Sequence, residues 1–509
     1  MKKILSVLLC VIIAVGVMVP CFAQDEKCNC GEPPIIYVAA LGSGAVIRDE
    51  GTDEETKLFR PETDKVIKQF LPLVPAAARL IADKNYDAFG DVLISCVNKV
   101  FGDLALDGNG NSKPNVTSEK FHPETAEHDI DHNYYFGYDF RLDPVENAKK
   151  LHTYIEEVKA ITRHDTVRFR ASSMGGVVAM SYLRLYGSQD IETIIFQCCP
   201  LQGTAVAGEL YNGKLEINKD ALLRYGSQAL PALDNDPLAG FLYVLIEALE
   251  VTGVWDILMN VADGLIENLQ ERIYNEALIP IFSTLPGIWS FVPDEYYESA
   301  KTYMKLDKGT QAGLIEKLDF YHYQVQSDAK NILNTAKQTG TTVYLLAGYN
   351  MQRTPLVTAY KATSDGTVDT KYASCGATCA NLGETLPADY RSGDEKFVSP
   401  DRMIDASTCI LPENTWFVKD MLHCKIHDGH TELYKWMFNS EKQMTVFDNE
   451  KYPQFLQNDV VNQRLTPVKE YENNVARMWD IVKNSTSIYN VLKFIFTFVQ
   501  SYLPKFLMK

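Results

Sequence analysis

The strongest constraint on the fold is an alternation of short apolar strands and amphipathic helices within residues 135–199. Residues 166–171 (TVRFRA) are a predicted strand, residues 172–176 (SSMGG) a glycine turn, residues 177–187 a helix and residues 193–199 a further strand. Strand, helix and strand in succession imply parallel strands joined by a crossover helix. We therefore predict an α/β fold, a mostly parallel sheet flanked by helices.

The domain organisation follows from a change of pattern in the middle of the chain. The 509 residues, 46% of them hydrophobic, suffice for a large core and an additional part. Long apolar helices fill residues 205–334, and the sheet pattern resumes at residues 342–347. An inserted helical cap explains this order better than two consecutive domains. We predict a catalytic domain in residues 33–204 and 335–445, the cap in residues 205–334, and a helical extension in residues 446–509.

The N-terminus has the layout of a secretory signal peptide. Lys2 and Lys3 precede an apolar run over residues 4–19, and Ala23 offers a small residue for cleavage. A membrane anchor is the alternative, but the run is short for a spanning helix. We expect residues 1–23 to be removed and the protein to be secreted or extracytoplasmic.

The charge balance of the chain is acidic. Lys and Arg total 49 and Asp and Glu total 66, so the formal net charge is -17. Such a charge repels the phosphates of nucleic acids and of anionic headgroups. We expect no nucleic-acid partner, and contact with an anionic membrane only through a local patch.

The cysteines fit disulfides or free thiols better than a metal site. Two of the 11 cysteines lie in the predicted signal peptide, and the odd number that remains leaves at least one thiol unpaired even if export permits disulfides. Cys28 with Cys30, and Cys375 with Cys379, lack a second pair at zinc-site spacing. We therefore predict neither a metal nor a cofactor.

The turn at residues 171–176 (ASSMGG) fits the small-x-Ser-x-Gly pattern of a nucleophile elbow, with a predicted strand before it and a helix after it. Attack on an ester carbonyl needs an activated oxygen nucleophile, a base and donors for the developing oxyanion. Ser173 is the predicted nucleophile. Ser172 fits less well, because counting from it places Arg170 and Met174 where small residues are needed.

Two backbone N–H groups are candidates for the oxyanion hole. The first is that of Met174, which follows the nucleophile at the start of the predicted helix. The second is that of Leu41, in the glycine-containing loop 40–44 after the predicted strand 35–40. An ordinary turn is the alternative for this loop.

The acid and the base should follow Ser173 in the chain. Asp365, in the tight turn SDGTV after the predicted strand 341–348, is the predicted acid, ahead of Asp369. Backbone capping in an Asx turn is the alternative role for Asp365.

Three histidines, His423, His427 and His430, cluster where the base is expected. His430 lies in the sharp turn DGH directly before the predicted helix 431–438, so we predict it as the base. His423 follows the predicted strand 415–420 and stays an alternative, although no turn residue marks its position.

Five motifs occur in the order seen in lecithin:cholesterol acyltransferase-like lipases. They are YDFRLDP (138–144), ASSMGG (171–176), CPLQGT (199–204), LPGIWSFVP (285–293) and SDGTV (364–368). The chain resembles this family, and also GPI inositol deacylases and bacterial lipases, in pieces over residues 35–439. The resemblance implies an α/β-hydrolase fold with a cap, a triad of Ser173, Asp365 and His430, and acyl-ester substrates. The family includes hydrolases and acyltransferases, so the acyl acceptor stays open.

The function expected from these residues is a secreted serine hydrolase that cleaves carboxylic esters of lipid-like acyl groups through an acyl-enzyme. An acyltransferase or an amidase or peptidase on the same triad is an alternative. A binding protein with an inactive site on a hydrolase scaffold is another, because a fold alone does not establish activity.

A C-terminal segment suggests a further partner. Residues 488–503 (IYNVLKFIFTFVQSYL) are apolar over most of a helical surface, and Lys493 argues against a spanning helix. The apolar face must be buried, either on the protein body or on a lipid surface. Peripheral contact with lipid is therefore an expectation beside the ester substrate.

Overall fold

The computed structural model describes residues 27–28, 30–58, 72–123, 133–229, 254–426, 430–439, 443–459 and 464–469. The predicted signal peptide and the C-terminal segment 488–503 lie outside these residues. Among the described helices, none combines the length and the apolar character needed to cross a membrane.

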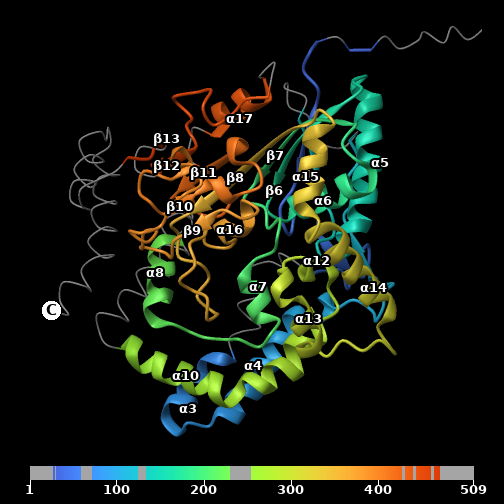
Figure 1. The fold of residues 1–509 in the computed structure, drawn as a ribbon. Helices are drawn as coiled ribbons and strands as arrows, with labels where there is room; N and C mark the ends of the chain where they lie inside the picture. Colours follow the sequence, from blue (N-terminus) through green and yellow to red (C-terminus); the bar gives the residue numbers. More distant parts are fainter. Residues whose placement is uncertain are drawn as a thin grey trace, which may run out of the picture.

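The centre of the fold is an eight-stranded sheet with the strand order β13-β12-β11-β8-β7-β6-β1-β5 (Figure 1). Neighbouring strands are parallel except for the antiparallel edge pair β12 and β13. The strands are β1 (Ile35–Val38), β5 (Asn133–Phe136), β6 (Val167–Ser172), β7 (Ile191–Gln197), β8 (Thr342–Tyr349), β11 (Thr415–Lys419), β12 (Phe455–Asp459) and β13 (Arg464–Pro467). The predicted α/β fold with a mostly parallel sheet is confirmed.

Both faces of the sheet are covered, which explains why the central strands β7 and β8 contain continuous apolar runs. Ile194 of β7 packs in one core, together with residues of α5 (Pro144–Thr162), α6 (Met174–Tyr186) and α15 (Ala329–Gln338). These three helices lie together in Figure 1. The next residue, Ile195, packs in the core on the opposite face, which includes residues of α17 (His430–Phe438).

Local sequence sets the start of the first long covering helix. Asp143 is the N-cap of α5, and its carboxylate accepts a hydrogen bond from the Val145 N–H at 3.0 Å. Pro144 occupies the first turn, where its missing N–H costs nothing. The motif LDP therefore ends one loop and begins the helix that covers β1 and β5.

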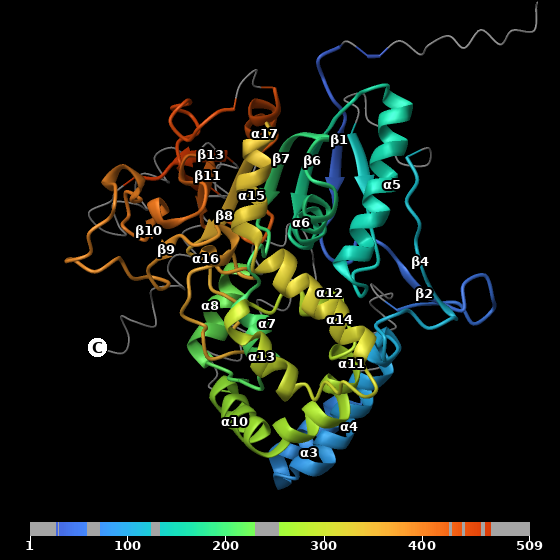
Figure 2. The same cartoon turned by 45° about the vertical axis from the view of Figure 1, so that its right-hand side comes forward.

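The described residues between β7 and β8 form helices and contribute no strand to the sheet. They are α7 (Ala205–Leu210), α8 (Lys219–Ala229), α10 (Val254–Ile273), α11 (Ile279–Phe282), α12 (Pro286–Trp289), α13 (Asp294–Tyr303), α14 (Ala312–Tyr321) and α15. Figure 2 shows most of them beyond the end of the sheet to which the strand arrows point. A separate core containing Trp289, Val292 and Leu314 holds part of this region together.

Two helices from an earlier part of the chain join this helical region. They are α3 (Leu73–Asp83) and α4 (Tyr86–Phe101), which the sequence analysis assigned to the catalytic domain. A Cβ atom on Gly90 of α4 would lie 2.8 Å from Leu269 of α10, so the two helices are in close contact. Arg272 of α10 also lies 2.7 Å from the Asp91 carboxylate. The helical region is thus built from two separate chain segments.

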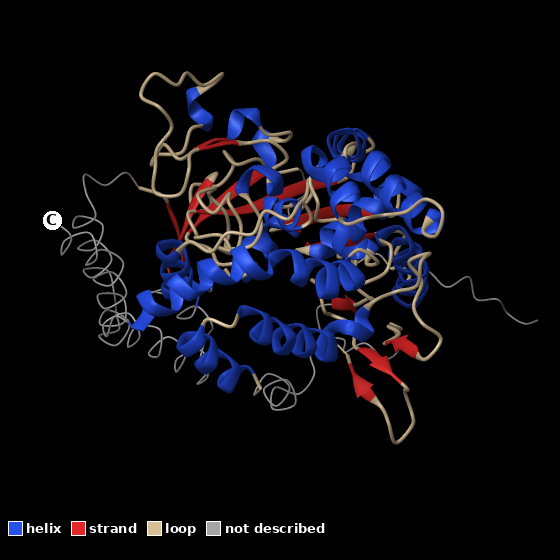
Figure 3. Cartoon of the chain, turned by 90° about the horizontal axis from the view of Figure 1, so that it is seen from below, coloured by secondary structure: helices blue, strands red, loops and turns tan. Residues whose placement is uncertain are grey.

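A small antiparallel sheet of β2 (Val46–Arg48), β3 (Thr56–Lys57) and β4 (Val116–Ser118) stands apart from the large sheet (Figure 3). Its three strands belong to the long chain segment that connects β1 with β5.

Candidate active site

Ser173 lies in a strained turn between β6 and α6. Its backbone has φ 52 and ψ −123, a conformation that a residue with a side chain rarely adopts. The Ser173 N–H donates to the Gln197 carbonyl at 3.0 Å, and the Gly176 N–H donates to the Ser173 carbonyl at 3.0 Å. These contacts hold the turn in the geometry of a nucleophile elbow.

The glycine after the elbow serine is required by close packing. A Cβ atom on Gly175 would lie 2.1 Å from the Val38 carbonyl oxygen and 2.8 Å from that of Ala39. The start of α6 is therefore pressed against the carboxyl end of β1. This contact explains the second small residue of the motif, and it brings the chain that leads to Leu41 beside the elbow.

A chain of hydrogen-bonding contacts starts at Ser173 and runs through His423 to Asp365. The Nε2 atom of His423 lies 2.8 Å from the Ser173 Oγ, and its Nδ1 atom lies 2.8 Å from the Asp365 Oδ2. Ser173 is only 8% exposed, Asp365 is fully buried, and the His423 side chain is 22% exposed. His423 is thus within direct reach of both Ser173 and Asp365, the geometry that a Ser-His-Asp triad requires.

The turn after β8 orients Asp365. Its Oδ1 atom accepts hydrogen bonds from the N–H groups of Thr367 at 2.9 Å and Val368 at 2.8 Å, which leaves Oδ2 for His423. Gly348 allows the turn to approach β8, because a Cβ atom there would lie 2.5 Å from the Asp365 Cβ. Asp365 therefore caps the turn with one carboxylate oxygen and contacts His423 with the other.

The imidazole of His423 is in an environment that favours its charged form. Burial opposes the charge, but the Asp365 carboxylate and the Cys424 thiol outweigh it and raise the pKa of His423 well above the usual value. A protonated imidazole beside the serine is the state that forms when it accepts the Ser173 proton.

His423, the alternative considered from the sequence, lies at the position expected for His430, between the serine and the acid. His430 is the first residue of α17, and its side chain lies outside the described residues, as does all of His427. The bends beside His423 are made by Asp420 at φ 56 and Cys424 at φ 57. Asp420 is a residue type that is common in turns, whereas Cys424 is not, so only one of the two bends carries a usual turn signal.

The two predicted oxyanion donors lie on the elements expected for them. Met174 is the first residue of α6, with a fully buried side chain. Leu41 lies in the turn after β1 and packs against the core that contains the elbow. Their roles as donors stay predictions.

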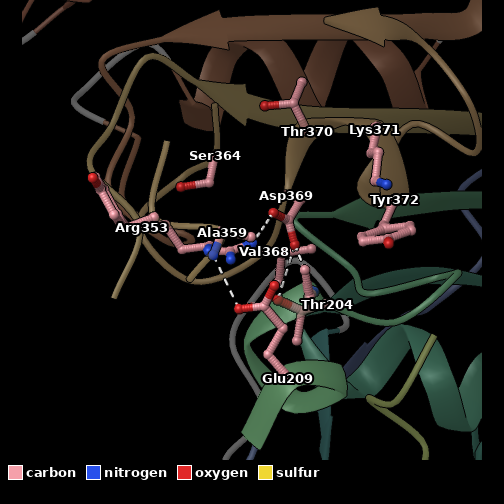
Figure 4. A network of polar contacts seen from close by, with 12 residues as sticks. Thr204, Glu209, Arg353, Ala359, Ser364, Val368, Asp369, Thr370, Lys371 and Tyr372 are labelled. Atoms are coloured by element: carbon pink, nitrogen blue, oxygen red, sulfur yellow. Dashed lines mark hydrogen bonds and ion pairs between the residues drawn. The ribbon is translucent and has the colours of Figure 1, made fainter. Parts of the chain in front are cut away.

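Neighbouring polar residues have other partners. Ser172 is buried and its Oγ lies 3.2 Å from the Gln197 Oε1, whereas the contact of His423 is with the neighbouring Ser173. Asp369, the second acid considered from the sequence, is buried against Arg353, and its Oδ2 accepts hydrogen bonds from the Ala205 N–H at 2.8 Å and the Thr204 hydroxyl at 3.2 Å (Figure 4). Asp369 therefore ties the turn that contains Asp365 to the start of α7.

Three clusters within the described residues each bring three side-chain atoms able to bind a metal within 4.8 Å of one another. They are Cys28, Cys30 and His164; His152, Glu156 and Asp190; and Cys198, His423 and Cys424. In the second cluster Asp190 is already paired with Lys159 at 2.5 Å. The third shares His423 with the catalytic geometry.

No family model and no curated protein matches this chain. Among solved structures, a chain in the crystal structure of the Tle4-Tli4 complex is similar with a TM-score of 0.26 and 11% sequence identity, over 64% of this chain and 75% of that chain. A likeness of this size carries no argument about function. The chemical assignment therefore depends on the site itself.

Proposed function

We propose that this protein is a serine hydrolase that cleaves carboxylic esters, with Ser173 as nucleophile, His423 as base and Asp365 as the acid that orients it. The observation that carries the proposal is the pair of 2.8 Å contacts that His423 makes with Ser173 and Asp365. With Nδ1–H donated to the carboxylate, the free Nε2 lone pair faces the serine hydroxyl. That tautomer accepts the proton as Oγ attacks the carbonyl carbon.

The reaction then proceeds in two halves. His423 passes the proton to the departing alcohol, which leaves an acyl group on Ser173. A water molecule activated by the same imidazole attacks the acyl carbon, and the acid is released as Oγ regains its proton. The N–H groups of Met174 and Leu41 are the proposed donors to the oxyanion of both tetrahedral intermediates.

An apolar acyl group is the substrate portion that fits the surroundings best. A Cβ atom on Gly287 of α12 would lie 2.9 Å from the Met174 Cε and 1.9 Å from the Phe140 carbonyl oxygen, so α12 packs directly against the elbow. Ile288 and Phe291, beside this contact, are only partly buried. The partly buried apolar side chains on and just after a helix that packs on the elbow support an ester of a lipid-like acyl group.

A fluorophosphonate probe together with a series of p-nitrophenyl esters of increasing chain length tests the proposal. We expect covalent labelling that is lost in Ser173→Ala and kept in Ser172→Ala, with kcat/KM increasing with chain length. No labelling of the folded protein would favour an inactive binding protein instead. Labelling with turnover of amides but not of esters would favour an amidase or peptidase, and acyl transfer to an added alcohol in preference to water would favour an acyltransferase.

Export and contact with a lipid surface are further parts of the proposal. They depend on residues 1–23 and 488–503, whose sequences suggest a signal peptide and an amphipathic helix. An enzyme that acts on aggregated acyl esters benefits from lying on the surface of its substrate.

A further inference from the structure

Two cysteines from distant parts of the chain meet beside the proposed base. The sulfur atoms of Cys198 and Cys424 and a ring nitrogen of His423 all lie within 4.8 Å of one another. Cys198 is fully buried, whereas Cys424 is partly exposed. We propose that Cys198 and Cys424 form a reversible disulfide that controls His423, an inference about the active centre that depends on the proposed function.

The backbone already holds both cysteines in place. Cys198 directly follows β7, and its N–H donates to the Leu346 carbonyl of β8 at 2.8 Å. The Cys424 carbonyl accepts a hydrogen bond from the Gln197 Nε2 at 3.0 Å. The loop of the base is thus tied to the residue that precedes Cys198, which keeps the two sulfurs near each other.

The neighbouring Cys199 faces a different environment. Its Sγ lies 3.3 Å from the Ala171 carbonyl oxygen, and a Cβ atom on Gly176 would lie 2.4 Å from it. Cys199 belongs to the core on the α6 side of the sheet, and Cys198 belongs to the core on the other side. Of these two consecutive cysteines, Cys198 is the one directed toward His423.

The reduced pair favours a state in which the base is already protonated. A hydrogen bond from Cys198 and the charge of His423 together lower the pKa of Cys424 to about 6, against the effect of burial. The resulting thiolate in turn helps to raise the pKa of His423. An imidazolium cannot accept the Ser173 proton. A disulfide has no thiolate, so oxidation returns His423 toward the neutral form.

The chemistry requires an external disulfide as the oxidant. The Cys424 thiolate attacks one sulfur of a small-molecule disulfide, forming a mixed disulfide and releasing one thiolate. Cys198 loses its proton and attacks the Cys424 sulfur, which displaces the second thiolate. One S–S bond forms in the protein, and the external disulfide is reduced to two thiols, which take up the proton of Cys198 and the proton that the His423 imidazolium releases. An added dithiol reverses the sequence.

Peptide mapping of the full chain under non-reducing conditions tests for the bond. After treatment with oxidised glutathione, we expect a cross-link between the peptides that carry residues 198–199 and residue 424, and its loss after dithiothreitol. The cross-link should be absent in Cys198→Ala and in Cys424→Ala. It should persist in Cys199→Ala, which resolves the two adjacent cysteines, and in Cys96→Ala, a buried control on α4.

Ester turnover of the same samples tests the control of the base. At a pH below the pKa of His423, we expect the reduced protein to have a lower kcat/KM than the oxidised protein. The expected decrease is about tenfold for each pKa unit by which the Cys424 thiolate raises the pKa of His423. Cys424→Ala should keep its activity whether or not dithiothreitol is present, while Cys96→Ala should respond like the wild type. Equal activity of oxidised and reduced wild type would overturn the proposal.

Two other results bear on the same pair of cysteines. Absence of the cross-link in folded, oxidised protein, or one bound zinc ion per chain that is lost in Cys198→Ala, would also overturn the disulfide. If the fluorophosphonate probe does not label Ser173, the proposed function is overturned, and the proposed control of His423 as a base is overturned with it. The peptide map would still decide whether the bond forms.

Discussion

The Nε2 atom of His423 lies 2.8 Å from the Oγ atom of Ser173 across a sequence separation of 250 residues. The contact joins the loop after β11 to the elbow after β6, two strands that are separated in the sheet by β7 and β8. In a parallel sheet, the segments that follow such strands emerge at one edge. The sheet therefore brings Ser173 and His423 together, and the turn after β8 places Asp365 against the other ring nitrogen of His423.

Replacement of Ser173 by alanine is expected to lower kcat for ester hydrolysis by at least about 10⁴-fold, because the nucleophile is lost while the turn keeps its backbone. Ser172→Ala is the matched control. It removes a contact with Gln197 worth about 1 kcal/mol of stability. Steady-state kinetics with a soluble ester, together with thermal unfolding, measures both effects. Similar losses of activity in the two variants would show that the elbow has been assigned to the wrong serine.

His423→Ala is expected to abolish formation of the acyl-enzyme, because the imidazole alone contacts both Ser173 and Asp365 among the described side chains. His430→Ala should retain most of the activity. Single-turnover kinetics with a chromogenic ester separates acylation from later steps. An inactive His430 variant beside an active His423 variant would restore the base predicted from the sequence.

The pH dependence of kcat/KM should follow the ionisation of His423. Since the base must be neutral, activity should increase as the pH rises through a pKa that Asp365 and Cys424 hold above its usual value. Asp365→Asn removes a negative charge, so its inflection should move to lower pH, with kcat lower by about 10⁴-fold. Cys424→Ala should move the inflection in the same direction with little loss of kcat. An inflection that stays in place in both variants would refute this account of the base.

The buried pair of Arg353 and Asp369 should contribute to stability rather than to chemistry. Asp369→Ala leaves the fully buried guanidinium without its carboxylate, which should cost about 3–5 kcal/mol of unfolding free energy. The double variant Arg353→Met with Asp369→Leu should be less destabilised than Asp369→Ala alone. Denaturant unfolding measures both, and a double variant as unstable as the single one would contradict the reasoning.

Truncation after residue 484 should reduce activity on liposomes or emulsions much more than on a soluble short-chain ester, and should weaken co-sedimentation with liposomes. The reason is the apolar face expected over residues 488–503. An equal loss on both substrates, or aggregation of the truncated chain, would indicate that the segment packs on the protein body.

The sequence by itself determined the features that depend on neighbouring residues. The elbow around Ser173 could be predicted because a strained turn between a strand and a helix needs small residues at fixed spacing. The turn of Asp365 could be predicted because an Asp followed by a Gly is typical of a tight turn in which the carboxylate accepts backbone N–H groups. Tertiary structure decided the features that depend on distant contacts. His423 lies between two residues with left-handed backbones, Asp420 and Cys424, and its contact with Ser173 depends on where the loop after β11 meets the elbow. Likewise α4 packs on α10, and Cys198 meets Cys424, only because the sheet order brings distant segments together.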